Sequence, residues 1–267
     1  MFEMKKVGII GGAGPEASNK FCELLIRKTP SRKDQDNIPF IHFCNPQIPD
    51  RTDFILGKGI NPLSEIVDNA KALEMAGADF LVVPCNTAHY FLSELQENVN
   101  LPIVDMTKVL VKEVLSEYPP IKKIGILATT GSIKAGIYQR YFNSVGVQCI
   151  LPSEEDQENL VMRSIYGSGG IKAGKKALPR KLLGIAVQKL IEAGVEAVVL
   201  GCTEIPLVLR QKDFAVKLYD PMELTAKEVI RYVKRDSEEN FVSVRYVLED
   251  FAKSLGRDLN KNVEVFE

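Results

Sequence analysis

The sequence predicts an α/β protein with two pseudo-symmetric lobes, each a mainly parallel sheet flanked by helices, and an active site between the lobes. Short apolar runs alternate with helical patterns along the chain, which is typical of parallel sheets covered on both faces. The chain also repeats itself at an offset of 117 residues, because residues 5–10 match residues 122–127 and Cys85 matches Cys202. A duplicated unit of strands and helices that ends in a thiol accounts for both observations.

The repeat also sets the expected boundaries. Residues 1–117 form the first lobe and residues 118–234 the second. Residues 235–267 have no counterpart in the repeat and form a C-terminal extension, in which residues 241–255 are expected to be one more amphipathic helix.

The strands of the first lobe are expected where apolar runs end at turn residues, at 7–10, 38–43, 80–83 and 101–104. Its helices are expected where apolar residues recur at helical spacing, after Gly14 as far as Lys28, at 62–75 and at 107–115.

The second lobe follows the same order. Its strands are expected at 124–127, 147–151, 197–200 and 216–219. Its helices are expected at 132–142, 154–166 and 181–192, with a glycine-rich loop at 167–174.

Composition narrows the class of function. A formal net charge of −1 argues against a nucleic-acid partner, and no apolar run is long enough to span a membrane. The five cysteines form no CxxC pair, so a metal site is not expected. Their odd number favours reduced thiols and a cytoplasmic location.

Cys85 and Cys202 are the candidate catalytic residues. Each follows a buried strand and precedes an apparent helix, where backbone N–H groups favour an anion and lower the pKa of a thiol. Buried packing explains either cysteine alone, but no packing rule requires two thiols in the same repeat register. Ligands of parallel sheets bind at the carboxyl ends of the strands, which is where both cysteines lie.

Other residues have two interpretations each. Arg51 and Lys172 suit the binding of a carboxylate, although solvated surface positions explain them equally well. His89, four residues after Cys85, permits a Cys/His nucleophile pair, but packing is the simpler explanation. The turn at residues 11–14 is explained more simply by tight packing than by phosphate binding.

Six segments occur in an order that resembles the aspartate/glutamate racemase superfamily, and most closely its aspartate racemase branch. The resemblance spans about residues 5–234, and the segments that carry it are residues 11–17, 45–52, 84–89, 129–132, 171–174 and 201–205.

The resemblance implies a racemase that uses no pyridoxal phosphate or other cofactor, acts on an acidic amino acid and forms a homodimer. Cys85 and Cys202 would be its paired acid/base thiols. Asn86, Thr87 and Thr130 would contact the α-carboxylate, and Arg51 and Lys172 would contact the side-chain carboxylate. Asp50 and Tyr166 would shape the pocket. Thr203 and Glu204 are further supporting residues, and Glu204 either tunes Cys202 or caps the helix that follows.

Two departures from the glutamate racemase pattern argue against glutamate as the main substrate. That branch has Asp-Ser where this chain has Gly11-Gly12, and Thr-His where it has Thr203-Glu204. The expected reaction is the interconversion of L- and D-aspartate by two-base proton transfer. The alternatives are a maleate isomerase, a hydantoin racemase, a broad acidic amino-acid racemase, a Cys85–His89 hydrolase and a non-catalytic amino-acid-binding protein.

Overall fold

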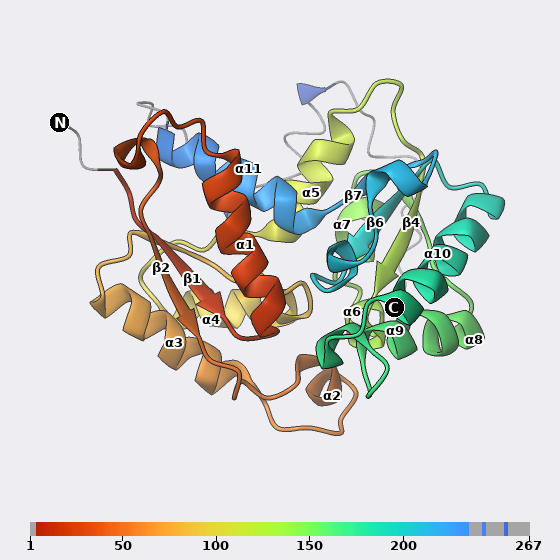
Figure 1. The fold of residues 1–267 in the computed structure, drawn as a ribbon, viewed down its shortest axis with the longest axis horizontal. Coiled ribbons are helices and arrows are strands. Elements are labelled where there is room, and N and C mark those ends of the chain that lie inside the picture. The colour runs from red at the N-terminus through yellow and green to blue at the C-terminus, as the bar shows by residue number, and fades with distance from the viewer. Residues whose placement is uncertain (1–3, 235–241, 244–253, 256–267) are drawn as a thin grey trace. The chain divides into compact units, whose positions relative to one another are not determined.

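The computed structural model describes residues 4–234, 242–243 and 254–255. The chain divides into two compact units (Figure 1). Of the described residues, the first unit holds 4–109, 222–234 and 242–243, and the second holds 110–221 and 254–255.

The first unit is built on a parallel sheet with the strand order β2-β1-β3. Its strands are β1 (Val7–Gly11), β2 (Phe40–Cys44) and β3 (Phe80–Val82). Val7 lies opposite both Phe40 and Phe80, so the three strands run in step and end at the same edge.

The fourth strand expected in this lobe, at 101–104, is reduced to a parallel bridge between Leu81 and Ile103. Leu81 donates to the Pro102 carbonyl and Val104 donates to the Leu81 carbonyl. Pro102 has no N–H group, which limits further pairing.

Helices cover both faces of the first sheet. The helices α1 (Pro15–Lys28), α11 (Pro221–Lys234) and the first turn of α5 (Met106–Leu115) bury apolar side chains against one face, together with Val7, Ile9 and Phe80. The helices α3 (Leu63–Met75) and α4 (Leu92–Asn98) cover the other face.

Helix α11 belongs to the first unit although it follows the second sheet in sequence. Its residues Met222, Ala226 and Val229 are fully buried and pack in the same cluster as Phe21 of α1. The compact units have other bounds than the predicted lobes, 1–117 and 118–234. The predicted lobes stay a prediction.

The second unit contains a parallel sheet with the order β5-β4-β6-β7. Its strands are β4 (Lys123–Ala128), β5 (Gln148–Ile150), β6 (Ala197–Gly201) and β7 (Lys217–Tyr219). Ala128 lies opposite Gly201, so the loops after β4 and β6 leave the sheet side by side. The two parallel sheets confirm the predicted α/β class.

The helices of the second unit are more divided than expected. The predicted helix 132–142 is two helices, α6 (Thr130–Lys134) and α7 (Gln139–Ser144), interrupted at Gly136 with φ of +60°. The predicted helix 154–166 is α8 (Glu154–Asp156), a π-helix (Gln157–Met162) and α9 (Arg163–Ile165). Helix α10 (Ala177–Glu192) begins earlier than predicted, because Pro179 is tolerated in the first turn.

The predicted helix at 241–255 lies mostly outside the described residues. Of that segment, Ser243 forms an antiparallel bridge with Val104, and the Val242 carbonyl accepts from Asp105.

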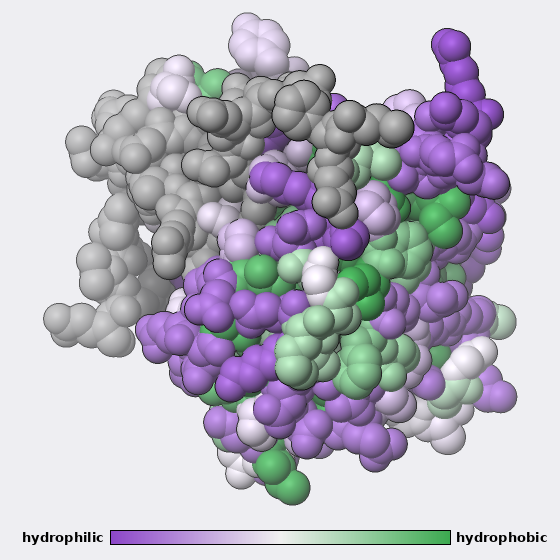
Figure 2. All heavy atoms as spheres, turned by 90° about the vertical axis from the view of Figure 1, so that its left-hand side faces the viewer, coloured by the Kyte–Doolittle hydropathy of each residue, from purple (hydrophilic) through white to green (hydrophobic). Residues whose placement is uncertain are grey.

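The face of the molecule in Figure 2 is mainly hydrophilic, with apolar side chains between polar ones. Within the described residues, no helix is both long enough and apolar enough to cross a membrane.

Candidate active site

The Cys85 loop leaves the carboxyl end of β3. Cys85 is 6% exposed, and its N–H donates to the Val83 carbonyl at 2.7 Å. A 3-10 helix (Thr87–Phe91) follows, and the α-helix α4 begins only at Leu92. Cys85 thus precedes a helix, as expected, but that helix begins as a 3-10 helix and becomes an α-helix only at Leu92.

His89 holds this loop in place through both ring nitrogens. Its Nε2 lies 3.0 Å from the Met106 N–H, and its Nδ1 lies 2.9 Å from the Cys85 carbonyl oxygen. Because the Met106 N–H is a donor, Nε2 accepts and Nδ1 carries the proton that it donates to Cys85. His89 thus bonds the backbone of Cys85, and these two contacts give no support to a Cys/His nucleophile pair.

Asn86 is the clearest sign of a ligand site in the first unit. The residue is 2% exposed, and neither its Oδ1 nor its Nδ2 makes a hydrogen bond within the described part of the chain. A buried polar group without a partner costs about 1–3 kcal/mol, and a bound ligand is one way to supply that partner. Thr87, next in sequence, is also buried.

The Arg51 side chain is buried and held by its own loop. Its Nη1 donates to the carbonyls of Ile48 and Pro49 at 3.2 and 3.0 Å. Asp50 caps the short helix α2 (Arg51–Ile55) by accepting from Thr52 N–H at 2.8 Å and from Asp53 N–H. Asp50 therefore shapes this loop through the backbone.

Helix α2 packs against the 3-10 helix that follows Cys85. The rings of Phe54 and Phe91 lie 5.5 Å apart, and Ile48 belongs to the same apolar cluster as Cys85. The first unit therefore brings the Arg51 loop and the Cys85 loop together at one edge of its sheet.

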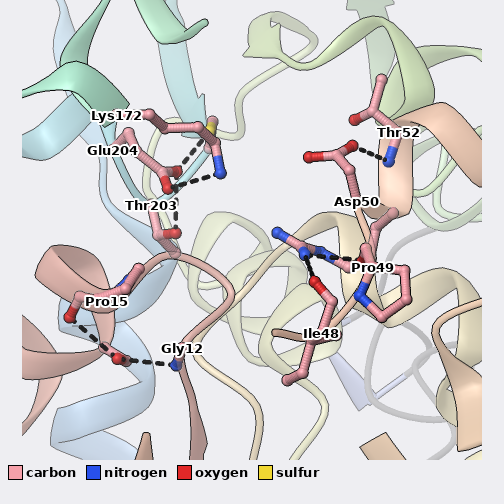
Figure 3. Close-up of polar contacts among 12 residues, drawn as sticks. Gly12, Pro15, Ile48, Pro49, Asp50, Thr52, Lys172, Thr203 and Glu204 are labelled. Carbon is pink, nitrogen blue, oxygen red and sulfur yellow. Dashed lines mark hydrogen bonds and ion pairs between the residues drawn. The ribbon is translucent and has the colours of Figure 1, made fainter. Parts of the chain in front are cut away.

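The turn after β1 is a packing feature. Gly12 has φ of +101°, and an added Cβ would lie 2.1 Å from the Asn45 carbonyl oxygen. Ser18 Oγ accepts from Gly12 N–H at 3.2 Å and donates to the Pro15 carbonyl at 3.1 Å (Figure 3). These contacts agree with the packing interpretation of the glycines.

A polar cluster that was not predicted from the sequence lies beside this turn. Asn45 Nδ2 lies 3.3 Å from both Glu65 Oε2 and Asn69 Oδ1. Asn69 is buried, and its Nδ2 has no partner in the described residues. The helical spacing could have predicted a buried polar side chain here, because Asn69 lies on the face of α3 that also carries Ile66 and Leu73.

The second unit holds Cys202 beside a carboxylate (Figure 3). Cys202 is 5% exposed, and its Sγ donates to Glu204 Oε2 at 2.9 Å. Thr203 Oγ1 donates to the same oxygen at 3.3 Å. Lys172 Nζ lies 3.5 Å from Glu204 Oε1 and 5.2 Å from the centre of the Tyr166 ring.

The expected lowering of the Cys202 pKa is wrong. Burial raises the pKa of the Cys202 thiol well above its usual value, and the charge and hydrogen bond of Glu204 raise it further. The segment after Cys202 is a 3-10 helix of only three residues (Ile205–Leu207). Its dipole is too small to offset the rise in the Cys202 pKa.

Thr130 is the first residue of α6, directly after β4, and the pairing of Ala128 with Gly201 brings this segment beside the Cys202 loop. Its Oγ1 donates to Glu158 Oε1 at 2.8 Å and accepts from Gln157 Nε2 at 3.2 Å. Its hydroxyl is therefore engaged by side chains of the π-helix.

Cys22 and Cys149 are poor candidates for thiolates. Burial is the main cause that raises the pKa of Cys22 to about 11 and that of Cys149 to about 12. Within the described residues, no group of three or more His, Cys, Asp or Glu side chains is arranged to hold a metal ion.

The family model for Asp/Glu/Hydantoin racemases matches residues 10–229. The chain belongs to this family. Membership confirms the resemblance inferred from the six segments and implies an isomerase of the racemase type.

Two curated relatives illustrate the range of the family. The chain is 25% identical over 229 residues to a broad specificity amino-acid racemase of Bacillus subtilis, a match that covers 84% of this chain and 96% of the relative. It is 30% identical over 176 residues to a glutamate racemase of Aquifex aeolicus, covering 62% and 63% of the two chains.

Two solved structures share the fold. The aspartate racemase of Picrophilus torridus is similar with a TM-score of 0.74 and 25% identity, over 86% of this chain and 94% of that one. An aspartate racemase homologue from Pyrococcus horikoshii is similar with a TM-score of 0.69 and 26% identity, over 87% and 100%.

Replacing His89 should loosen the Cys85 loop. His89→Ala removes the partner of the Met106 N–H and of the Cys85 carbonyl, so we expect it to lower the free energy of unfolding by about 2–4 kcal/mol. Urea denaturation measures this change. His42→Ala is the matched control, because His42 is only partly buried and contacts Ser18 Oγ at 3.2 Å. Equal stability of the two variants would contradict the positioning role of His89.

Proposed function

We propose that this protein is a cofactor-independent amino-acid racemase that interconverts L- and D-aspartate. The observation that carries the proposal is a buried thiol in the same position of both units, Cys85 after β3 and Cys202 after β6. Membership in the Asp/Glu/hydantoin racemase family supports it.

The reaction needs two groups that can each give or take a proton. One group removes the α-proton from one face of the substrate, and the other delivers a proton to the opposite face. In the proposed mechanism a thiolate and a thiol do this work and exchange roles at each turnover. Proton loss from such a pair is coupled, so its pKa values belong to the pair.

The α-carboxylate has to take up negative charge as the α-carbon loses its proton. Donors aimed at a developing charge in a site without water stabilise it strongly. The buried Asn86 amide, which has no partner in the described residues, is the first candidate donor. Thr87 and the Thr130 turn are proposed to assist, and Thr130 would then have to exchange its contact with Glu158.

The preference for aspartate rests on two cations. Arg51 presents a guanidinium whose plane is fixed by Ile48 and Pro49, which suits a bidentate carboxylate contact. Lys172 adds a point charge beside Tyr166. The Picrophilus torridus structure is that of an aspartate racemase, which supports the same substrate here.

Broad specificity is the second candidate function. The similarity to the Bacillus subtilis racemase extends over 84% of this chain, which favours a wider set of amino acids. In addition, Lys172 lies beside Glu204, so its charge is partly balanced before any ligand binds. A panel of aspartate, glutamate and neutral amino acids distinguishes the two candidates.

The proposed chemistry needs reduced thiols, which favours the cytoplasm. A homodimer is proposed only from the resemblance to the family.

Replacing either proposed catalytic thiol should stop racemisation. We expect Cys85→Ala and Cys202→Ala each to leave no measurable formation of D-aspartate from L-aspartate, because each removes one of the two proton-transferring groups. Chiral chromatography measures the product. Cys44→Ala, which removes an exposed thiol, should keep wild-type activity. Full activity of either catalytic-site variant would exclude the two-thiol mechanism.

Arg51 should determine the selectivity for acidic substrates. Arg51→Ala is expected to raise KM for aspartate about 10- to 100-fold, as loss of a charge-assisted hydrogen bond of about 1.5–3 kcal/mol implies. Steady-state kinetics with aspartate and with alanine separate recognition from general damage, since alanine has no side-chain carboxylate. An equal rise in KM for aspartate and for alanine would refute the assignment of Arg51 to the side-chain carboxylate.

A further inference from the structure

Cys202, Glu204 and Lys172 form a cluster of one thiol, one carboxylate and one ammonium group. The Cys202 thiol donates to Glu204 Oε2 at 2.9 Å, and both residues are almost fully buried. Lys172 Nζ faces the other carboxylate oxygen at 3.5 Å. With the proton on sulfur, the carboxylate and the ammonium balance each other and the cluster is neutral.

Removing the thiol proton to solvent would leave two anions beside one cation. Two buried groups of like charge each disfavour ionisation of the other, and burial raises the free-energy cost of ionisation further. Glu204 Oε1 accepts no hydrogen bond from the described residues, so Lys172 compensates it only through its charge. This arrangement favours the protonated thiol.

The Cys85 thiol is in a different situation. The Cys85 carbonyl accepts from the His89 ring, and no carboxylate of the described residues bonds the sulfur. The neighbouring cation of its unit is Arg51, whose loop packs against the same 3-10 helix through Phe54 and Phe91. The carboxylate is thus present on one thiol of the repeated pair and absent from the other.

We propose that Glu204 is a positioning residue that keeps the proton on Cys202 in the ligand-free enzyme, so that Cys85 supplies the thiolate for the first proton transfer and Cys202 supplies the acid. The catalytic consequence rests on the proposed two-thiol racemisation. The protonation of Cys202 itself does not, because it follows from contacts within the second unit.

Several titratable or charged groups lie around Cys202. Glu204 follows it on the same loop, and Lys172 comes from the 3-10 helix Ile171–Ala173 with Tyr166 under its ammonium. Glu158 of the π-helix accepts from Thr130, the first residue of α6. Only Glu204 bonds the sulfur directly among the described residues, so its carboxylate is the group to test.

The test is a pH titration of the Cys202 thiolate by its ultraviolet absorbance, taken as the difference between a protein and the same protein with Cys202→Ser. Glu204→Gln keeps the size of the side chain and removes the charge. We expect it to shift the titration of Cys202 down by about one to three pH units. Lys172→Met should shift it upward, because the ammonium favours the thiolate.

Asp156→Asn is the matched control, since it removes a surface carboxylate of the same unit that pairs with Lys189. It should leave the titration of Cys202 where it is in the wild type. If the pH at which Cys202 titrates is unchanged or higher in Glu204→Gln, the proposal is overturned. Opposite shifts of this pH in the Glu204 and Lys172 variants would exclude a general loss of folding.

Proton exchange in D₂O tests the consequence for catalysis. Cys202→Ala should still exchange the α-proton of one aspartate enantiomer, and Cys85→Ala should exchange more slowly with either. Adding Glu204→Gln to Cys85→Ala should raise that exchange. Equal exchange in both single variants would overturn the assignment of roles. Absence of exchange in the wild type would refute the proposed function, while the titration of Cys202 would still decide the role of Glu204.

Discussion

Parallel pairing of the central strands is the constraint on which the candidate site depends. In each unit the strand that precedes the cysteine pairs in parallel with the first strand of that unit, β3 with β1 and β6 with β4. All loops that follow these strands therefore leave the sheet at the same edge. The register between β4 and β6 brings the segment after Ala128 beside Cys202. The packing of α2 against the 3-10 helix after Cys85 brings the Arg51 loop beside the Cys85 loop.

The two repeated thiols lie in different electrostatic surroundings. Cys202 has a carboxylate within hydrogen-bond distance and a lysine behind it. The loop of Cys85 is held by a histidine that bonds backbone groups, and beside it lies a buried amide whose two polar atoms are unpaired in the described residues. The two units thus place their repeated thiols in surroundings that differ in charge, which agrees with the proposal that the thiols begin the reaction in opposite protonation states.

Much of the fold could be predicted from the sequence because its signals are local. Apolar runs and helical spacing located the main strands and helices, and the offset of 117 residues singled out Cys85 and Cys202. The pKa of Cys202 could not be predicted, because burial and the orientation of Glu204 depend on tertiary packing. The placement of α11 on the first sheet was missed for the same reason, since its partners Val7 and Phe21 lie far away in sequence.

The most direct test of the central claim is proton NMR of L-aspartate with the purified, reduced protein in D₂O without added cofactor, combined with chiral analysis. If two thiols act on one α-carbon, the α-proton signal disappears and deuterated D-aspartate accumulates. A persistent α-proton signal and the absence of the D-isomer would contradict the account.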